Sequence, residues 1–297
     1  MAIVQPRSQR WRLLAAHLFL LALCATVVFP FLVVLSVSLR PGNFAASGSI
    51  WPQTISFEHW RYVLGLPVAG PDGQLIAPDL PVLLWLWNSV KVALASALVT
   101  LLLSTTASYA LARLQFRGRR QLLTGLMLMQ MFPAVLSLVA IYAIFDRIGS
   151  AFPALGLNTH ASLVLAYSGG IAMHVWTLKG YYDTLPREIE EAAVVDGATP
   201  WQGFWRVLLP MALPILMVVF LLAFIGAVIE YPVASVLLTQ QDQLTLAVGS
   251  KLFVHEHNFH WGDFAAAAIL SGLPITAVFL LAQRWMIAGL AAGGVKG

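Results

Sequence analysis

The acidic residues of the chain gather in one short segment. Five of its thirteen Asp and Glu residues lie within residues 183–196, and two of these, Glu190 and Glu191, are adjacent. Carboxylates at this density are suited to meet basic groups on another protein, where charge pairs give orientation more than affinity.

The residues around these carboxylates predict two helices joined by a glycine bend. Pro186 suits the start of a helix, and the good helix formers of residues 187–196 follow it. Gly197 is a natural stop, and Thr199–Gln202 has the pattern of a capping box that opens a second helix. A helix of about ten residues is marginal alone in water, so we expect it to dock in a groove of a partner. The alternative is an amphipathic helix on the membrane surface, but that predicts a basic polar face.

Other residues that could carry chemistry give weaker signals. His255, Glu256 and His257 suggest zinc, but residue 259 is Phe, so the H-E-x-x-H pattern is absent and we expect no metal site. The phosphate-binding pattern G-x-x-x-x-G-K-[ST] does not occur. Energy for any transport must therefore come from a partner or an ion gradient. An intramembrane enzyme is a further alternative, without a convincing nucleophile–base pair.

The composition indicates a membrane protein. The chain is 59% hydrophobic and 10% charged, with a mean hydropathy of +0.81, whereas soluble domains carry about 25% charged residues. Nucleic-acid binding is disfavoured because no basic stripe with interleaved aromatic residues occurs. Six apolar stretches predict membrane spans, at residues 13–39, 83–112, 122–145, 157–178, 207–229 and 264–287. The first is too long for a signal peptide and predicts an uncleaved anchor.

The basic residues predict the orientation of these spans. Twelve Lys and Arg residues fall on the side of the two termini and four on the other side, so both termini are expected in the cytoplasm. Residues 180–206 then form a cytoplasmic loop, 232–263 an outer loop and 288–297 a cytoplasmic tail. One membrane domain over residues 1–297 is the simplest organisation.

Several segments match a known family. Glu191-Ala192-Ala193, Gly197, Val207 and Leu209-Pro210 have the spacing of the EAA motif of ABC importer permeases, with Val207 where the motif usually has Ile. Residues 85–91, 130–137, 157–160 and 293–297 extend the likeness over nearly the whole chain. The chain therefore resembles the maltose/maltodextrin permease subunits. This resemblance implies an all-α polytopic membrane protein with the type I ABC importer permease (MetI-like) fold, in the bacterial inner membrane.

The resemblance also implies partners and roles. The chain would form a heterodimer with a second permease, bind two ATPase subunits and a periplasmic sugar-binding protein, and contact lipid but no nucleic acid. ATP and Mg would lie on the ATPase subunits, with no cofactor and no catalytic residue on this chain. An importer for another sugar is the alternative. An ion-driven secondary transporter is less favoured, because no inverted repeat with ionisable groups at the midplane is evident.

Three groups of residues receive functions on this basis. The loop that couples to the ATPase contains Glu190, Glu191, Ala192, Ala193, Gly197, Leu209 and Pro210. The tail that reaches between the ATPases is Gly293, Gly294, Val295, Lys296 and Gly297, and the contact with the binding protein comprises Leu252, His255, Glu256, His257 and Asn258. From the residues themselves, Pro133, Glu230 and Pro232 at kinks or span ends are candidates for an outer gate.

Overall fold

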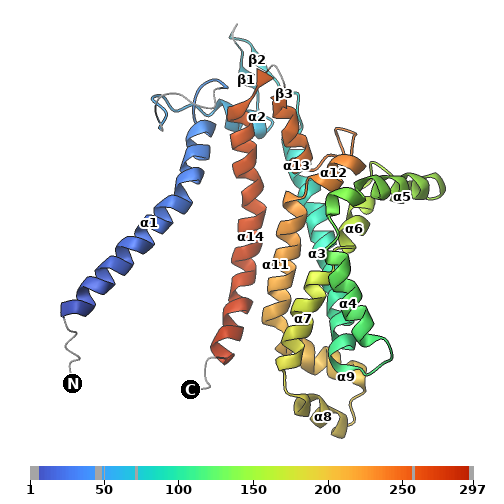
Figure 1. The fold of residues 1–297 in the computed structure, drawn as a ribbon. Coiled ribbons are helices and arrows are strands. Elements are labelled where there is room, and N and C mark those ends of the chain that lie inside the picture. Colours follow the sequence, from blue (N-terminus) through green and yellow to red (C-terminus); the bar gives the residue numbers. More distant parts are fainter. Residues whose placement is uncertain (1–6, 44–48, 50, 71–72, 256–257, 294–297) are drawn as a thin grey trace. The chain divides into compact units, whose positions relative to one another are not determined.

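The computed structural model describes residues 7–43, 49, 51–70, 73–255 and 258–293, which are helical with two short hairpins (Figure 1). In chain order the elements are α1 (Arg7–Ser38), α2 (Glu58–Val63), β1 (Val68–Ala69), β2 (Leu75–Ile76), α3 (Val82–Arg113), α4 (Arg119–Gln130), η1 (Ala134–Ser137), α5 (Leu138–Ala151), η2 (Pro153–Leu155), α6 (His160–Ser168), α7 (Ala172–Thr184), α8 (Arg187–Val195), α9 (Pro200–Gly203), η3 (Phe204–Leu208), α10 (Leu209–Met211), α11 (Leu213–Ile229), α12 (Pro232–Leu237), α13 (Leu246–Gly249), η4 (Ser250–Phe253), β3 (Val254–His255), β4 (Asn258–Phe259) and α14 (Trp261–Gly293).

The chain divides into two compact units. The first comprises Met1–Pro81 and Leu252–Leu270, and the second Val82–Lys251 and Ser271–Gly297. Both hairpins belong to the first unit and are antiparallel, with Val68 opposite Ile76 and Val254 opposite Phe259.

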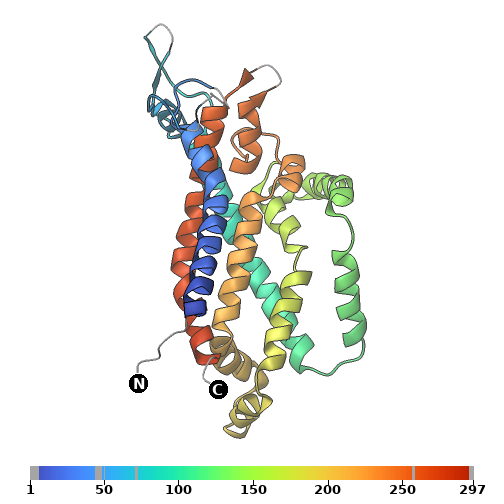
Figure 2. The same ribbon diagram turned by 60° about the vertical axis from the view of Figure 1, so that its left-hand side comes forward.

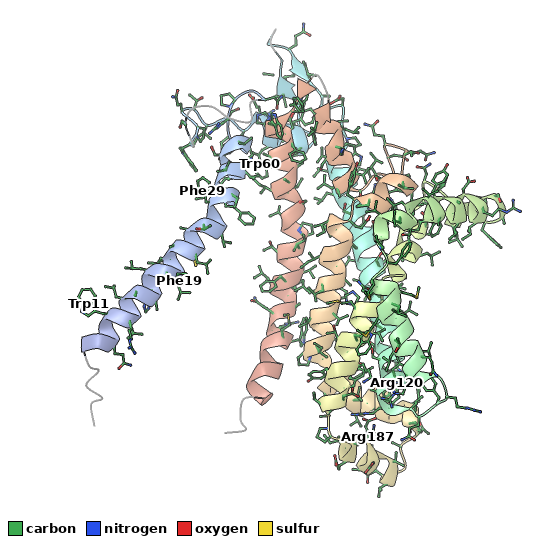
Figure 3. All side chains as sticks on the ribbon, in the orientation of Figure 1. Trp11, Phe19, Phe29, Trp60, Arg120 and Arg187 are labelled. Carbon is green, nitrogen blue, oxygen red and sulfur yellow. The ribbon has the colours of Figure 1, made fainter. Side chains whose placement is uncertain are left out.

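The side chains of α1 in the first unit are exposed over most of the helix. Figure 3 shows Trp11, Phe19 and Phe29 projecting from it. The exposed fractions of these residues are 72%, 67% and 52%. A helix that is apolar on every side suits contact with lipid or with another membrane subunit.

A buried histidine joins three segments of the first unit. The ring of His59 in α2 lies with Nδ1 2.7 Å from Asp263 Oδ1 and Nε2 2.9 Å from Arg40 O. Both partners are acceptors, so the arrangement favours the protonated ring, in which both nitrogens donate. Burial lowers the pKa of His59, but the hydrogen bond and the charge of Asp263, with the charge of Glu58, outweigh this and hold that pKa above its ordinary value.

The second unit is built around α3. This helix packs against α6, α7 and α11, and Figure 2 shows the same helices side by side from a second direction. Its buried face is rich in small residues, among them Ala93, Ala97, Ser104 and Ser108, which allow helices to approach closely. The hydroxyl of Ser108 donates across this contact to the carbonyl of Val175 in α7, at 2.9 Å.

Four helical segments among the described residues are long and apolar enough to cross a bilayer: Trp11–Ser38, Val82–Arg113, Ala134–Ala151 and Trp261–Met286. The number rises to six if two bent pairs each count as one span. These pairs are His160–Ser168 with Ala172–Thr184, bent by 50°, and Pro200–Met211 with Leu213–Ile229, bent by 78°. The segment 122–145, which the sequence predicts as one span, is divided near Pro133 into α4 and α5, and α5 runs across the direction of α4 (Figure 1).

The loop between α12 and α13 is held through its backbone by side chains of other elements. Trp85, Asn88 and Ser89 lie in the first turns of α3, and Asn158 precedes α6. From α3, Trp85 Nε1 donates to Gln241 O (2.7 Å), and Asn88 Nδ2 donates to Asp242 O (2.9 Å) and Leu244 O (3.0 Å). The hydroxyl of Ser89 accepts from Leu246 N (2.8 Å). Asn158 Oδ1 accepts from Thr239 N (2.6 Å) and Gln240 N (3.0 Å). This loop is fixed although the side chains of residues 239–242 are exposed.

Candidate functional site

The acidic segment forms the predicted helix and glycine bend. Helix α8 (Arg187–Val195) begins after Pro186, and Glu188 and Glu190 lie in its first turn, where the helix dipole favours negative charge. The helix ends at Val195, and Gly197, two residues later, lies at φ 86°. Gly197 N donates to Val194 O and Ala198 N to Ala193 O, both at 2.9 Å, which is the Schellman arrangement of a helix end.

The second helix opens with the predicted capping box. Thr199 N donates to Gln202 Oε1 at 2.8 Å, and Gln202 N donates to Thr199 Oγ1 at 3.3 Å. The helix widens into a π-helical turn at η3 (Phe204–Leu208), and Leu209 and Pro210 follow in α10. The chain then bends by 78° into α11. Leu209 and Pro210, which the sequence predicts as coupling residues, thus lie at the junction between the loop and the apolar helix α11.

Helix α8 presents apolar surface that no other part of the described chain covers. Ile189, Val194 and Val195 are 37%, 57% and 86% exposed, and Glu191 and Ala192 are exposed beside them. Apolar and acidic side chains on one short rod suit a groove on a partner.

The two adjacent glutamates lie in different environments. Glu191 is exposed, whereas Glu190 accepts a hydrogen bond from Nε of Arg113, the last residue of α3, at 2.5 Å. Only 8% of the Arg113 side chain and 18% of the Glu190 side chain are exposed. The Glu190 carboxylate is thus engaged within the chain, and its predicted contact with a partner stays a prediction.

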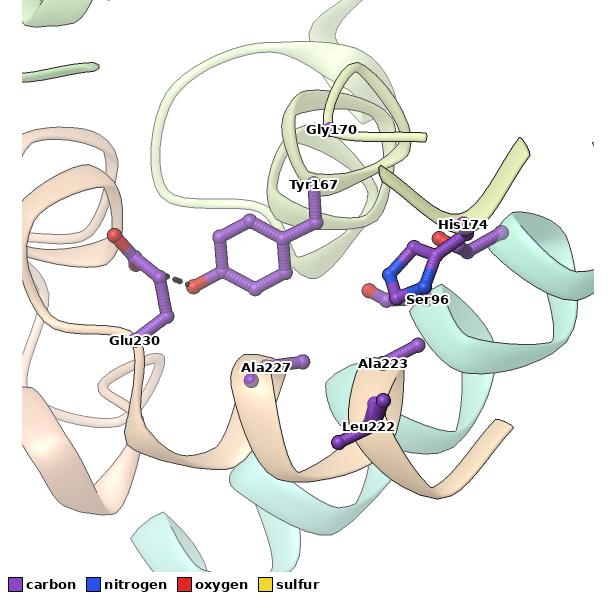
Figure 4. Close-up of a pocket in the computed structure, with 10 residues that line it drawn as sticks. Ser96, Tyr167, Gly170, His174, Leu222, Ala223, Ala227 and Glu230 are labelled. Carbon is purple, nitrogen blue, oxygen red and sulfur yellow. Dashed lines mark hydrogen bonds between the residues drawn. The ribbon is translucent and has the colours of Figure 1, made fainter. Parts of the chain in front are cut away.

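A hollow of about 210 Å³ with polar and apolar lining residues lies between α3, α11 and the bend that joins α6 to α7 (Figure 4). Tyr167 Oη donates to Glu230 Oε2 at 2.8 Å, and His174 and Ser96 line the opposite side. The hydroxyl of Ser96 is buried without a hydrogen-bond partner. The ring of His174 also lines the hollow.

The gate candidates lie at helix ends. Glu230 follows α11, and its carboxylate accepts from Val233 N and Ala234 N at 2.8 and 3.0 Å. It thereby caps α12, which begins at Pro232. Pro133 precedes η1 in the break between α4 and α5. A gating role for these three residues stays a prediction.

The outer contact residues and the tail are only partly described. Leu252 lies in η4, His255 ends β3 and Asn258 begins β4, while Glu256 and His257 lie outside the described residues. Gly293 ends α14, and Gly294, Val295, Lys296 and Gly297 also lie outside them. Within the described chain, no group of three or more His, Cys, Asp or Glu residues could hold a metal ion.

Comparisons with known proteins define first the class and then the family. A solved bacterial ABC transporter involved in the import of the acidic polysaccharide alginate matches with a TM-score of 0.74 at 20% identity, over 94% of this chain and 98% of that chain. The MetNI methionine ABC transporter in an inward-facing form matches with a TM-score of 0.56 at 17% identity, over 69% and 94%. The fold is therefore that of an ABC importer permease, which confirms the predicted class.

The family follows from sequence similarity. The model for "Binding-protein-dependent transport system inner membrane component" matches residues 101–291. The maltose/maltodextrin transport system permease protein MalG of Photorhabdus laumondii is 59% identical, that of Escherichia coli K12 58% and that of Vibrio vulnificus 55%, each over all of both chains. The chain belongs to the binding-protein-dependent transport system inner membrane components, which are transport subunits rather than enzymes, as the sequence predicts.

Proposed function

We propose that this chain is one permease subunit of an ATP-driven importer for maltose and maltodextrins. Its full-length identity of 58–59% to curated maltose/maltodextrin permeases carries the proposal. The chain forms half of a pore in the bacterial inner membrane together with a second, different permease. Both of its termini face the cytoplasm, in agreement with the excess of basic residues on that side.

The chain couples to ATP hydrolysis through α8. The exposed Glu191 and the exposed apolar side chains of Val194 and Val195 enter a groove of an ATPase subunit, where basic groups meet the carboxylate. Gly197 sets the angle between α8 and the helix that leads to Leu209 and Pro210, so movement of α8 reaches α11. ATP and Mg are held by the ATPase subunits, and residues 293–297 reach between them.

The outer side receives the sugar from a binding protein. Residues 252–258 contact that protein, and Pro133, Glu230 and Pro232 border the outer gate. The bond between Tyr167 and Glu230 joins the α6–α7 bend to the start of α12. A gate that opens by separating these elements would have to break that bond, and this position of Glu230 between them supports a gating role.

The test is reconstitution of the chain with a second permease, the ATPase subunits and the binding protein in lipid. ATP hydrolysis is expected to rise with maltose-loaded binding protein, and sugar uptake into vesicles is expected to require the ATPase subunit. If a different sugar and not maltose stimulates ATP hydrolysis, the proposed substrate is wrong. Uptake that is driven by an ion gradient without the ATPase subunit would refute the proposal.

A further inference from the structure

The guanidinium of Arg113 joins three elements at one end of the second unit. Its Nε donates to Glu190 in α8 at 2.5 Å, and its Nη2 donates to the carbonyl of Leu185 at 3.0 Å. Leu185 is the residue that directly follows α7. Arg113 itself ends α3, whose carbonyl end favours a positive charge.

This contact rests on a well-packed base. Ala112, beside Arg113, is fully buried with Leu178 and Tyr182 of α7 and with Phe204 of η3. Besides the bond of Glu190, α8 makes a longer hydrogen bond to α3, from Arg187 Nη2 to the carbonyl of Ala112 at 3.5 Å. Val194 and Val195 are exposed, and the other main neighbours of α8 are α9 and η3. The ion pair is therefore the main side-chain tie from α8 to the ends of α3 and α7.

Helical geometry divides the work between the adjacent glutamates. Successive residues of a helix point about 100° apart, so a helix that turns Glu190 towards Arg113 turns Glu191 to the outside. The carboxylate of Glu190 is paired within the chain, and that of Glu191 is available to a partner.

We propose that Arg113 and Glu190 are positioning residues that lock α8 to α3 and α7, so that a pull on α8 moves these membrane helices as one body. This inference rests on the proposed function, because it explains how force from the ATPase reaches the permease. The pair is partly shielded from solvent and has two well-directed donors, and hydrogen bonds to charged groups are stronger than neutral ones. Without the pair, α8 keeps the long hydrogen bond from Arg187 to the carbonyl of Ala112 and the short chain connection at Pro186, and it would pivot on these more freely.

The first measurement is hydrogen exchange across residues 188–196 in the complete transporter in lipid nanodiscs. Arg113→Gln and Glu190→Gln are each expected to speed exchange roughly tenfold or more, the usual scale for a lost hydrogen bond to a charged group. The double variant is expected to be no faster than Arg113→Gln alone, because that variant has already lost the bond that Glu190→Gln removes. Arg117→Gln is the matched control, since Arg117 is exposed on the following loop, and its exchange is expected to match the parent.

Arg113→Lys separates charge from geometry. Lysine keeps the positive charge but cannot direct two donors in the fixed fork of arginine. Exchange in this variant is expected to lie between that of the parent and that of Arg113→Gln. Unchanged exchange in both single Gln variants, or effects that multiply in the double variant, would overturn the tie.

The second measurement is the amount of sugar imported per ATP hydrolysed, with assembly of all subunits verified. Both single Gln variants are expected to lower this ratio, which a purely structural role would leave unchanged in a correctly assembled complex. Faster exchange with an unchanged amount of sugar imported per ATP would show that the pair does not transmit force from α8 to the membrane helices. If the parent transporter imports no maltodextrin at all, the proposed substrate fails, but the exchange cycle still decides whether the tie exists.

Discussion

Substitutions at Gly197 measure how much the positive φ of this one residue contributes to the stability of the bend. It lies at φ 86°, and a Cβ added there would meet nothing within 4 Å. Any cost of a side chain is therefore conformational rather than steric. The left-handed region costs L-residues roughly 1–2 kcal/mol, with Asn tolerated best. We expect Gly197→Asn to cost a few tenths of a kcal/mol and Gly197→Ala about 1 kcal/mol. Gly197→Val should cost about 2 kcal/mol or more, because its branched Cβ disfavours positive φ further.

Hydrogen exchange at Gly197 and Ala198 measures this series directly, because their amides close the bend by donating to Val194 and Ala193. At 1.4 kcal/mol per factor of ten, exchange should accelerate about fivefold in Gly197→Ala and about thirtyfold or more in Gly197→Val. Sugar imported per ATP should fall in the same order, since the bend sets the direction of α8.

Gly180→Ala provides the matched control. Gly180 lies within α7, is exposed, and a Cβ there would also meet nothing within 4 Å. Alanine inside a helix is more stable than glycine by about 0.5–1 kcal/mol, so this variant should exchange no faster than the parent. Equal exchange rates in Gly197→Asn and Gly197→Val would refute the reasoning, because Asn tolerates a positive φ far better than Val.

Three further changes test other parts of the chain. Glu191→Lys should insert normally but reduce sugar uptake at least about tenfold, as expected when one member of an interface charge pair is reversed; normal uptake, measured against equal membrane abundance, would contradict docking. In Gly249→Ala the new Cβ would lie 2.3 Å from Cε3 of the buried Trp85, so thermal unfolding should show a loss of about 1–3 kcal/mol, whereas Gly226→Ala, with nothing within 4 Å, should not. Because the pKa of His59 is raised in the folded chain, its stabilisation is fully present below about pH 6.5 and is lost as the pH rises through the folded-state pKa. Exchange in α2, corrected for its intrinsic pH dependence, should accelerate over that range and lose this dependence in His59→Gln.

Local chemistry made the loop predictable. Proline before the acidic helix, glycine after it and the Thr199–Gln202 capping box each act within a few residues. Each is therefore visible in the sequence, and the structure confirms the helix, the bend and the second helix.

The contacts that fix this loop could not be predicted in the same way. Arg113 at the end of an apolar stretch is one more positive charge beside the membrane, and nothing local pairs it with Glu190, 77 residues later. The contact exists because α3 packs against α7, which brings the end of α3 close to the end of α7 and to the helix α8 that follows it. The division of residues 122–145 is a similar case: the stretch is apolar throughout, and Pro133 permits a kink as readily as the observed change of direction.

The backbone anchoring of the loop before α13 makes its conformation independent of its own side chains. Trp85, Asn88, Ser89 and Asn158 bind main-chain atoms, which every residue type supplies. The outward side chains at Gln240, Gln241 and Asp242 can therefore be exchanged through evolution or by an engineer without collapsing the loop. The main chain of this loop is therefore a rigid frame whose outward side chains can change independently of it.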